Sequence, residues 1–112
     1  MNRVSDEQTY ESFITRAFDL SNQRIERAGD PAGLADANRF KDSDLAAIKA
    51  GVAYAMSTYA FHVRNYLSNK LTAADDNDIT THINETFNAS SHKEVLDQII
   101  SFNKRIVQKY NL

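Results

Sequence analysis

The feature that most constrains the fold is a long stretch, residues 43–69, in which apolar and small residues recur at helical spacing and charges are rare. One stripe of this stretch carries large apolar side chains three and four positions apart: Leu45, Ile48, Val52, Met56, Tyr59, Val63 and Tyr66. That spacing places them on one face of an α-helix, which at 1.5 Å per residue is about 40 Å long. We predict that this helix starts at Asp42 or Ser43.

Two further stripes run along the same predicted helix. Tyr54 and Phe61, seven positions apart, form an aromatic stripe. The third stripe consists of small residues at four-residue steps and leads to an imidazole: Ala47, Gly51, Ala55 and His62. A helix that is apolar or small nearly all round is normally buried on most sides. We therefore expect the small-residue stripe to make the closest contact, either within the chain or with a second copy.

A first helix is predicted before this stretch. Ser5 caps it, with Gln8 three residues on completing a capping-box pattern, and Gly29 followed by Pro31 stops it. Its apolar face is marked by residues at three- and four-residue steps: Tyr10, Phe13, Ile14, Ala17, Leu20, Ser21 and Ile25.

Two more helices are predicted in the second half of the chain. The polar segment 72–78 can start a short helix, which Asn88 ends. Ser91 with Glu94 is a second capping-box pattern and starts the last helix, which extends to Tyr110. The apolar residues of these helices are Ile79, Ile83 and Phe87, and then Val95, Leu96, Ile99, Ile100, Phe102, Ile106 and Val107.

Residues 30–42 read as a connector that Leu34 and Phe40 anchor on the core, with a helical turn within residues 32–40 as an alternative. Three glycines and one proline in 112 residues favour long uninterrupted elements. We predict one all-α domain over residues 1–112, a small helical bundle of three long helices plus one short helix.

Composition and charge exclude several classes of function. A chain without cysteine has no disulfide and no thiolate metal site, and a net charge of −2 with mixed signs gives no basic face for nucleic acid. The stretch from Leu45 to Val63 contains Lys49 and His62, which make it too polar for a membrane span. The N-terminus turns polar at once, unlike a secretory signal, so a cytoplasmic protein is expected.

Candidate groups for chemistry do not form a motif. Glu85 follows His82 by three positions, which is the reverse of the metal-binding order, and neither His62 nor His92 adds a second ligand at helical spacing. The acidic residues within 75–78 lack the glycine and ligand series of a calcium loop. We therefore expect no metal, no cofactor and no enzymatic activity.

Five short motifs form a pattern along the chain: residues 10–14, 19–23, 54–55, 59–61 and 108–110, which read YESFI, DLSNQ, YA, YAF and QKY. This pattern resembles a family of short, uncharacterised proteobacterial helical proteins. The chain departs from that family at Ser21, where alanine is usual, and in a longer insert before the last helix. The resemblance implies a bacterial cytoplasmic helical protein, and it carries over no activity, cofactor or binding residue.

The leading functional hypothesis is a non-enzymatic protein–protein interaction or regulatory module, either a homodimer or a small adaptor. It rests on the long helix, whose apolar and small faces exceed what its neighbours in a short chain are expected to cover. A close variant is an immunity-type protein that neutralises a toxin, for which the acidic segment 72–78 is the only support.

The second hypothesis is a small-ligand-binding bundle with a pocket between the first two long helices. Its lining would be Tyr54, Tyr59, Phe61 and His62. Aromatic residues at helical spacing more often pack in a core, so the discriminating observation is a cavity of several hundred cubic ångströms with convergent polar groups.

Overall fold

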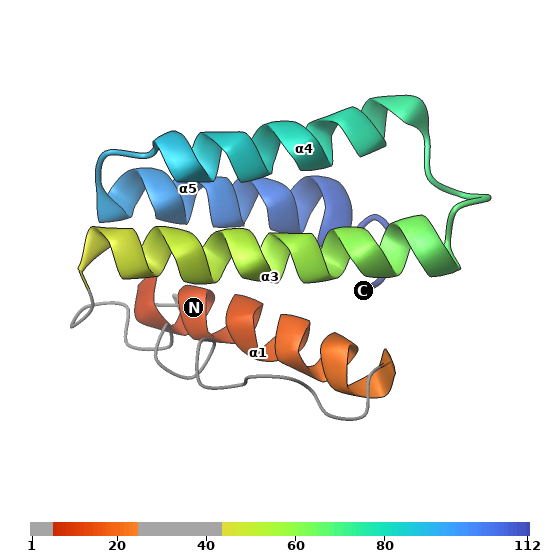
Figure 1. Cartoon of the computed structure of the whole chain (residues 1–112), viewed down its shortest axis with the longest axis horizontal. Helices are drawn as coiled ribbons and strands as arrows, with labels where there is room; N and C mark the ends of the chain where they lie inside the picture. The colour runs from red at the N-terminus through yellow and green to blue at the C-terminus, as the bar shows by residue number, and fades with distance from the viewer. Residues whose placement is uncertain (1–5, 25–43) are drawn as a thin grey trace, which may run out of the picture.

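The computed structural model describes residues 6–24 and 44–112, and within these ranges the chain is helical with no strand. The elements are α1 (Asp6–Arg24), α3 (Leu45–Tyr66), α4 (Ala73–Asn88), α5 (His92–Phe102) and the π-helical turn η1 (Asn103–Val107). Figure 1 shows α3 between α1 and α4, with α5 behind; α1, α3 and α5 run in one direction and α4 runs back. The predicted all-α bundle is confirmed. None of the described helices is both long and apolar enough to cross a bilayer.

Helix α3 begins later and ends earlier than its sequence pattern predicts. The Asp44 carboxylate accepts a hydrogen bond from the Ala47 amide at 2.9 Å, which makes Asp44 the N-cap and Leu45 the first helical residue. The predicted starts at Asp42 or Ser43 are therefore wrong by two or three residues. The predicted cap at Ser5, the stop at residues 29–31 and the connector 30–42 lie outside the described residues.

The second half of the chain keeps the predicted order of helices but changes their lengths. Thr72 caps α4 by accepting from the Asp75 amide at 3.0 Å, and α4 spans 16 residues, more than the 11 of α5. Ser91 caps α5 by accepting from the Glu94 amide at 3.1 Å. The last helix does not continue as one α-helix to Tyr110, because α5 ends at Phe102 and passes into the π-helical turn.

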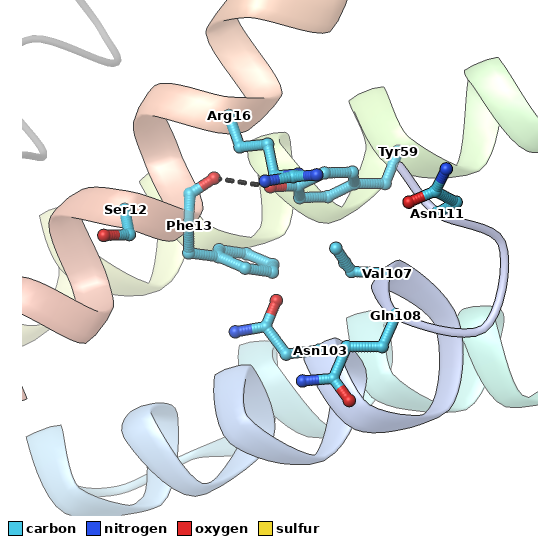
Figure 2. Close-up of a pocket in the computed structure, with 8 residues that line it drawn as sticks. All are labelled: Ser12, Phe13, Arg16, Tyr59, Asn103, Val107, Gln108 and Asn111. Carbon is cyan, nitrogen blue, oxygen red and sulfur yellow. Dashed lines mark hydrogen bonds between the residues drawn. The ribbon is translucent and has the colours of Figure 1, made fainter. Parts of the chain in front are cut away.

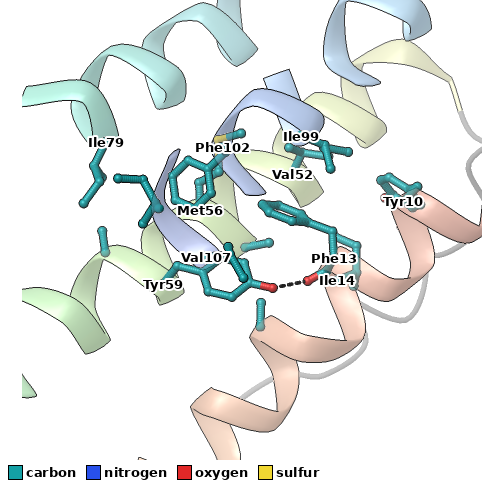
Figure 3. Close-up of a cluster of buried hydrophobic side chains, with 14 of the residues drawn as sticks. Tyr10, Phe13, Ile14, Val52, Met56, Tyr59, Ile79, Ile99, Phe102 and Val107 are labelled. Atoms are coloured by element: carbon teal, nitrogen blue, oxygen red, sulfur yellow. Dashed lines mark hydrogen bonds between the residues drawn. The ribbon is translucent and has the colours of Figure 1, made fainter. Parts of the chain in front are cut away.

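Three aromatic rings from three helices form the centre of the core (Figure 3). Phe13 of α1 lies 5.0 Å from Tyr59 of α3, and Phe102 at the end of α5 lies 5.7 Å from each of them, centroid to centroid. The Tyr59 hydroxyl donates to the Phe13 carbonyl oxygen at 2.7 Å, which satisfies the buried phenol. Aliphatic side chains surround the rings: Ile14, Ile48, Val52, Met56, Ile79, Ile99 and Ile106.

A polar network closes the end of the bundle where α3 turns into α4. The Asp75 carboxylate, largely buried, accepts from Lys109 Nζ at 2.7 Å and from the Tyr110 hydroxyl at 2.5 Å. Tyr110 also accepts from the Thr72 amide at 3.4 Å. The hydrogen bond from Lys109 and then that from Tyr110 hold the pKa of Asp75 below its ordinary value of 3.8. This network attaches the segment after η1 to the start of α4.

Replacing Asp75 by asparagine should therefore destabilise the protein at neutral pH by about 1 kcal/mol, discounted because Lys109 is half exposed. The pKa of Asp75 is lower in the folded protein than in the unfolded chain. The hydrogen bonds to its carboxylate therefore stabilise the fold at pH values above the unfolded pKa, and this stabilisation is lost as the pH falls through the folded pKa. Urea unfolding of both proteins should show a gap at pH 7 that narrows at about pH 3 or below. An equal gap at both pH values would contradict this account.

Candidate functional site

The structure divides the residues singled out from the sequence into an inner and an outer group. Gly51, Ala55 and Tyr59 are buried, whereas Ala47 is exposed. Tyr54 and Phe61 are 48% and 47% exposed, so the expectation that they pack in the core is wrong. His62 is half-buried, with its ring 5.2 Å from that of Tyr66. Tyr66, the last residue of the large apolar stripe, is exposed as well.

Two small residues of α3, Gly51 and Ala55, are buried on the side that faces α1. The buried centre of α3 lies between Met56 and Tyr59. Met56 contacts Thr86 of α4, and Tyr59 contacts α1. Gly51 and Ala55 fall on the Tyr59 side of that centre by helical spacing, and Figure 1 places α1 there. Side chains this small leave room for the α1 backbone, and the close contact expected along this stripe stays a prediction.

The side of α3 opposite the buried centre of the helix forms what we call the outer face: Ala47, Ala50, Tyr54, Ser57 and Phe61. All five residues are exposed, and none carries a charge. Seven-residue spacing establishes that Tyr54 and Phe61 share one face. It does not establish that another helix covers that face. Here Tyr59, on the opposite side of α3, packs against Phe102 at the end of α5. A solvent-facing helix surface without charge over four turns is a candidate contact surface.

A pocket of about 390 Å³ lies where α1, α3 and the π-helical turn meet (Figure 2). Its lining comes from three parts of the chain: Ser12, Phe13 and Arg16 of α1, Tyr59 of α3, and Asn103, Val107, Gln108 and Asn111. Of the four residues expected to line a pocket, only Tyr59 lines this one. The structure does not bring Tyr54, Phe61 and His62 to this place, because Tyr54 and Phe61 lie on the outer face.

Two irregularities of the backbone line the same pocket. In η1 the Gln108 amide donates to the Asn103 carbonyl at 2.8 Å, five residues back, so the side chains are rotated relative to an α-helix. Asn111 has φ of 55°, a left-handed conformation that asparagine tolerates better than most residues. π-Helical turns and unusual backbone angles concentrate at functional sites. Their coincidence makes this pocket the second candidate site.

Charge and hydrogen bonding suit this pocket to binding. The Arg16 Nε donates to the Leu112 backbone oxygen, which ties the last turn of the chain to α1. Burial raises the pKa of Tyr59 far above neutrality, with the Arg16 charge lowering it and Asp19 raising it, so the phenol stays neutral. The lining residues contain no carboxylate and no pair of nucleophile and base, but they offer several hydrogen-bond donors. This composition can form hydrogen bonds to a polar ligand.

The histidine and carboxylate candidates have structural partners. His82 is buried, with Nδ1 2.8 Å from the Gln98 side-chain oxygen and its ring edge-on to Phe102. In segment 72–78, three carboxylates form ion pairs within the chain: Asp75 with Lys109, Asp76 with Arg64, and Asp78 with Arg105. Among the described residues, no three histidine, aspartate or glutamate side chains are grouped so as to hold a metal ion.

No family model, curated protein or solved structure shows significant similarity to this chain. The resemblance to the proteobacterial family therefore stays a prediction. Function has to be argued from the outer face and the pocket themselves.

Proposed function

We propose that this protein is a non-enzymatic interaction module that self-associates through the outer face of α3. The observation that carries the proposal is the uncharged, partly aromatic surface that α3 presents to solvent from Ala47 to Phe61. Exposed apolar patches of this kind mark contact surfaces, and contact cores are depleted of charge and rich in aromatic residues.

The order of residues on the outer face suits a second copy of the same chain. In a two-fold contact between antiparallel α3 helices centred on Tyr54, each residue faces the one equally distant on the other side of Tyr54. Phe61 of one copy then faces Ala47 of the other, because both lie seven positions from Tyr54. A large side chain meets a small one at both ends of the contact, and no charge is buried without a partner.

The size of the outer face indicates a weak contact. Helix α3 has 22 residues and is therefore about 33 Å long. A face about 10 Å wide along that length covers on the order of 300 Å², well below the roughly 800 Å² per partner of a stable complex. We therefore propose a reversible association whose extent depends on concentration, as a regulatory module requires.

The acidic segment supports this proposal over an immunity-type role. An inhibitor that binds a basic toxin needs carboxylates available to the partner. Asp75, Asp76 and Asp78 each pair with a basic residue of this chain instead. The negative charge of segment 72–78 is thus partly neutralised by basic residues of the same chain, whereas the outer face keeps its apolar side chains exposed.

A single cysteine can test the contact, because the chain contains none. Tyr54→Cys places a thiol on the proposed two-fold axis, where two copies bring their thiols within the short Cα separation that a disulfide needs. Under mild oxidation of the folded protein, this variant should form covalent dimers rapidly and in a concentration-dependent way. Non-reducing electrophoresis measures the rate.

Asn84→Cys is the matched control, since residue 84 is exposed on α4, away from the outer face. It should form dimers only at the slow rate of random collision. Sedimentation of the unmodified protein should show weak association that Ala50→Glu abolishes and Asn84→Glu does not. Equal crosslinking at residues 54 and 84, together with a monomer at all concentrations, would refute the proposal.

A further inference from the structure

One exposed aromatic residue of α4 lies beside the outer face of α3. Phe87 is in the last turn of α4, and its side chain is exposed. It belongs to a row of residues three or four positions apart, which we call the Phe87 line: Asp76, Thr80, Ile83 and Phe87. Arg64 of α3 donates to the Asp76 carboxylate at 2.6 Å and to the Thr80 hydroxyl at 3.1 Å. The Phe87 line therefore runs along α3 on the side where Arg64 lies.

Arg64 also marks the edge of the outer face. Ala50, Ser57 and Arg64 follow one another at seven-residue steps, so they share one line of α3. Because Ala50 and Ser57 belong to the outer face, the Phe87 line borders that face, and Figure 1 shows α3 and α4 side by side. Exposed aromatic rings of two helices are thus on the same side of the molecule.

The exposed carboxylates of α4 add no unpaired charge to this side. Asp78 and Glu85, seven positions apart, share a different line of the helix, and Asp78 pairs with Arg105 of η1 at 3.3 Å. Asp76 is the one carboxylate of the Phe87 line, and its ion pair with α3 balances its charge. The uncharged surface of α3 therefore continues onto α4 as far as Phe87.

A buried contact sets the level of Phe87 along α3. The Thr86 hydroxyl donates to Met56 Sδ at 3.4 Å. Because α4 runs antiparallel to α3, Phe87 is level with Tyr54 to within about one residue. A two-fold axis that makes two α3 helices antiparallel lies in the contact plane, at a right angle to both. An axis through Tyr54 therefore continues to α4 and reaches it close to Phe87.

We infer that α4 forms the second half of the self-association surface and that Phe87 packs against Phe87 of the second copy. This inference rests on the proposed two-fold contact of α3. Both aromatic residues near the axis, Tyr54 and Phe87, then meet their own counterparts. Each copy contributes a layer of two helices, so the partner that fits this surface is a second copy with the same layer.

The added helix changes the size of the contact. Helix α4 has 16 residues and is therefore about 24 Å long. A face about 10 Å wide along that length adds on the order of 240 Å² to the roughly 300 Å² of α3, which brings the contact to about two-thirds of the 800 Å² per partner of a stable complex. Helix α4 thus strengthens the association but leaves it reversible.

Phe87→Cys tests this inference, because the chain contains no cysteine of its own. The axis brings the two copies of residue 87 together, so under mild oxidation this variant should form covalent dimers about as fast as Tyr54→Cys. Thr81→Cys is the matched control: residue 81 is exposed on α4 but lies about 120° round the helix from Phe87. It should crosslink only at the rate of random collision. Asn84 lies opposite the buried Thr86 and stays at the rim of this larger surface.

A second measurement does not depend on a disulfide. Phe87→Ala should raise the dissociation constant measured by sedimentation by about tenfold, the usual effect of truncating an aromatic residue near the centre of a contact. Thr81→Ala should leave it unchanged, and circular dichroism should show both variants folded.

The outcomes separate this inference from the proposed function. Rapid crosslinking at residue 54 without crosslinking at residue 87, or an unchanged dissociation constant for Phe87→Ala, would overturn the role of α4 and leave the α3 contact intact. Slow crosslinking at both positions, together with a monomer at all concentrations, would overturn self-association itself.

Discussion

Replacing Phe102 by alanine is expected to lower the free energy of unfolding by about 3–5 kcal/mol. Phe102 is fully buried and packs against Phe13, Tyr59 and His82, so truncation leaves a void shared by α1, α3, α4 and α5. Such a loss is a large fraction of the roughly 5–15 kcal/mol that stabilises an ordinary domain. Urea unfolding followed by circular dichroism measures it.

Phe87→Ala is the control for this prediction, because Phe87 lies on α4 with 53% of its surface exposed. It removes the same group from a site where little packing is lost, so its effect should stay below about 1 kcal/mol. Similar losses at residues 87 and 102 would show that the three-ring cluster is not the centre of the core.

Enlarging Ala55 to leucine is expected to destabilise the protein by about 1–3 kcal/mol. Ala55 is fully buried on the side of α3 that faces α1, where a larger side chain would push the two helices apart. Because alanine and leucine both favour helix, the loss measures packing and not helix propensity. Thermal and urea unfolding of the variant should both show it.

Ala46→Leu makes the same change on the same helix at an exposed position. Its stability should remain within about 0.5 kcal/mol of the unmodified protein. If Ala55→Leu were equally well tolerated, the small residues would not mark a close contact between α1 and α3. The pair of variants thus tests the interpretation of the small-residue stripe directly.

Helix positions and the buried stripe could be predicted because they depend on local chemistry. Ser91 caps α5 through the Glu94 amide as its sequence pattern indicates. The cap of α3 is Asp44, by the same mechanism, two or three residues from the start that the pattern predicts. The stripe from Ile48 to Val63 is buried because its spacing matches one helix face.

The outer face and the pocket could not be predicted, since both depend on how helices are arranged. Periodicity groups Tyr54 with Phe61 but cannot tell which face of α3 has no neighbour. The residues of segment 103–111 follow an apolar stripe that reads as ordinary helix, and nothing local signals a π-helical turn after Phe102. Ser12 and Arg16, four apart on α1, line the pocket only because the end of the chain packs beside them.

The three-ring cluster has a consequence for the order in which the chain can fold. Its members, residues 13, 59 and 102, are far apart in sequence, so its closure depends on non-local contacts that slow folding compared with local helix pairs. A nascent chain that has not yet reached residue 102 can pair α1 with α3 but leaves Phe13 and Tyr59 without their third ring. During synthesis, the apolar surface that Phe13 and Tyr59 present to Phe102 therefore stays exposed until residue 102 has been made.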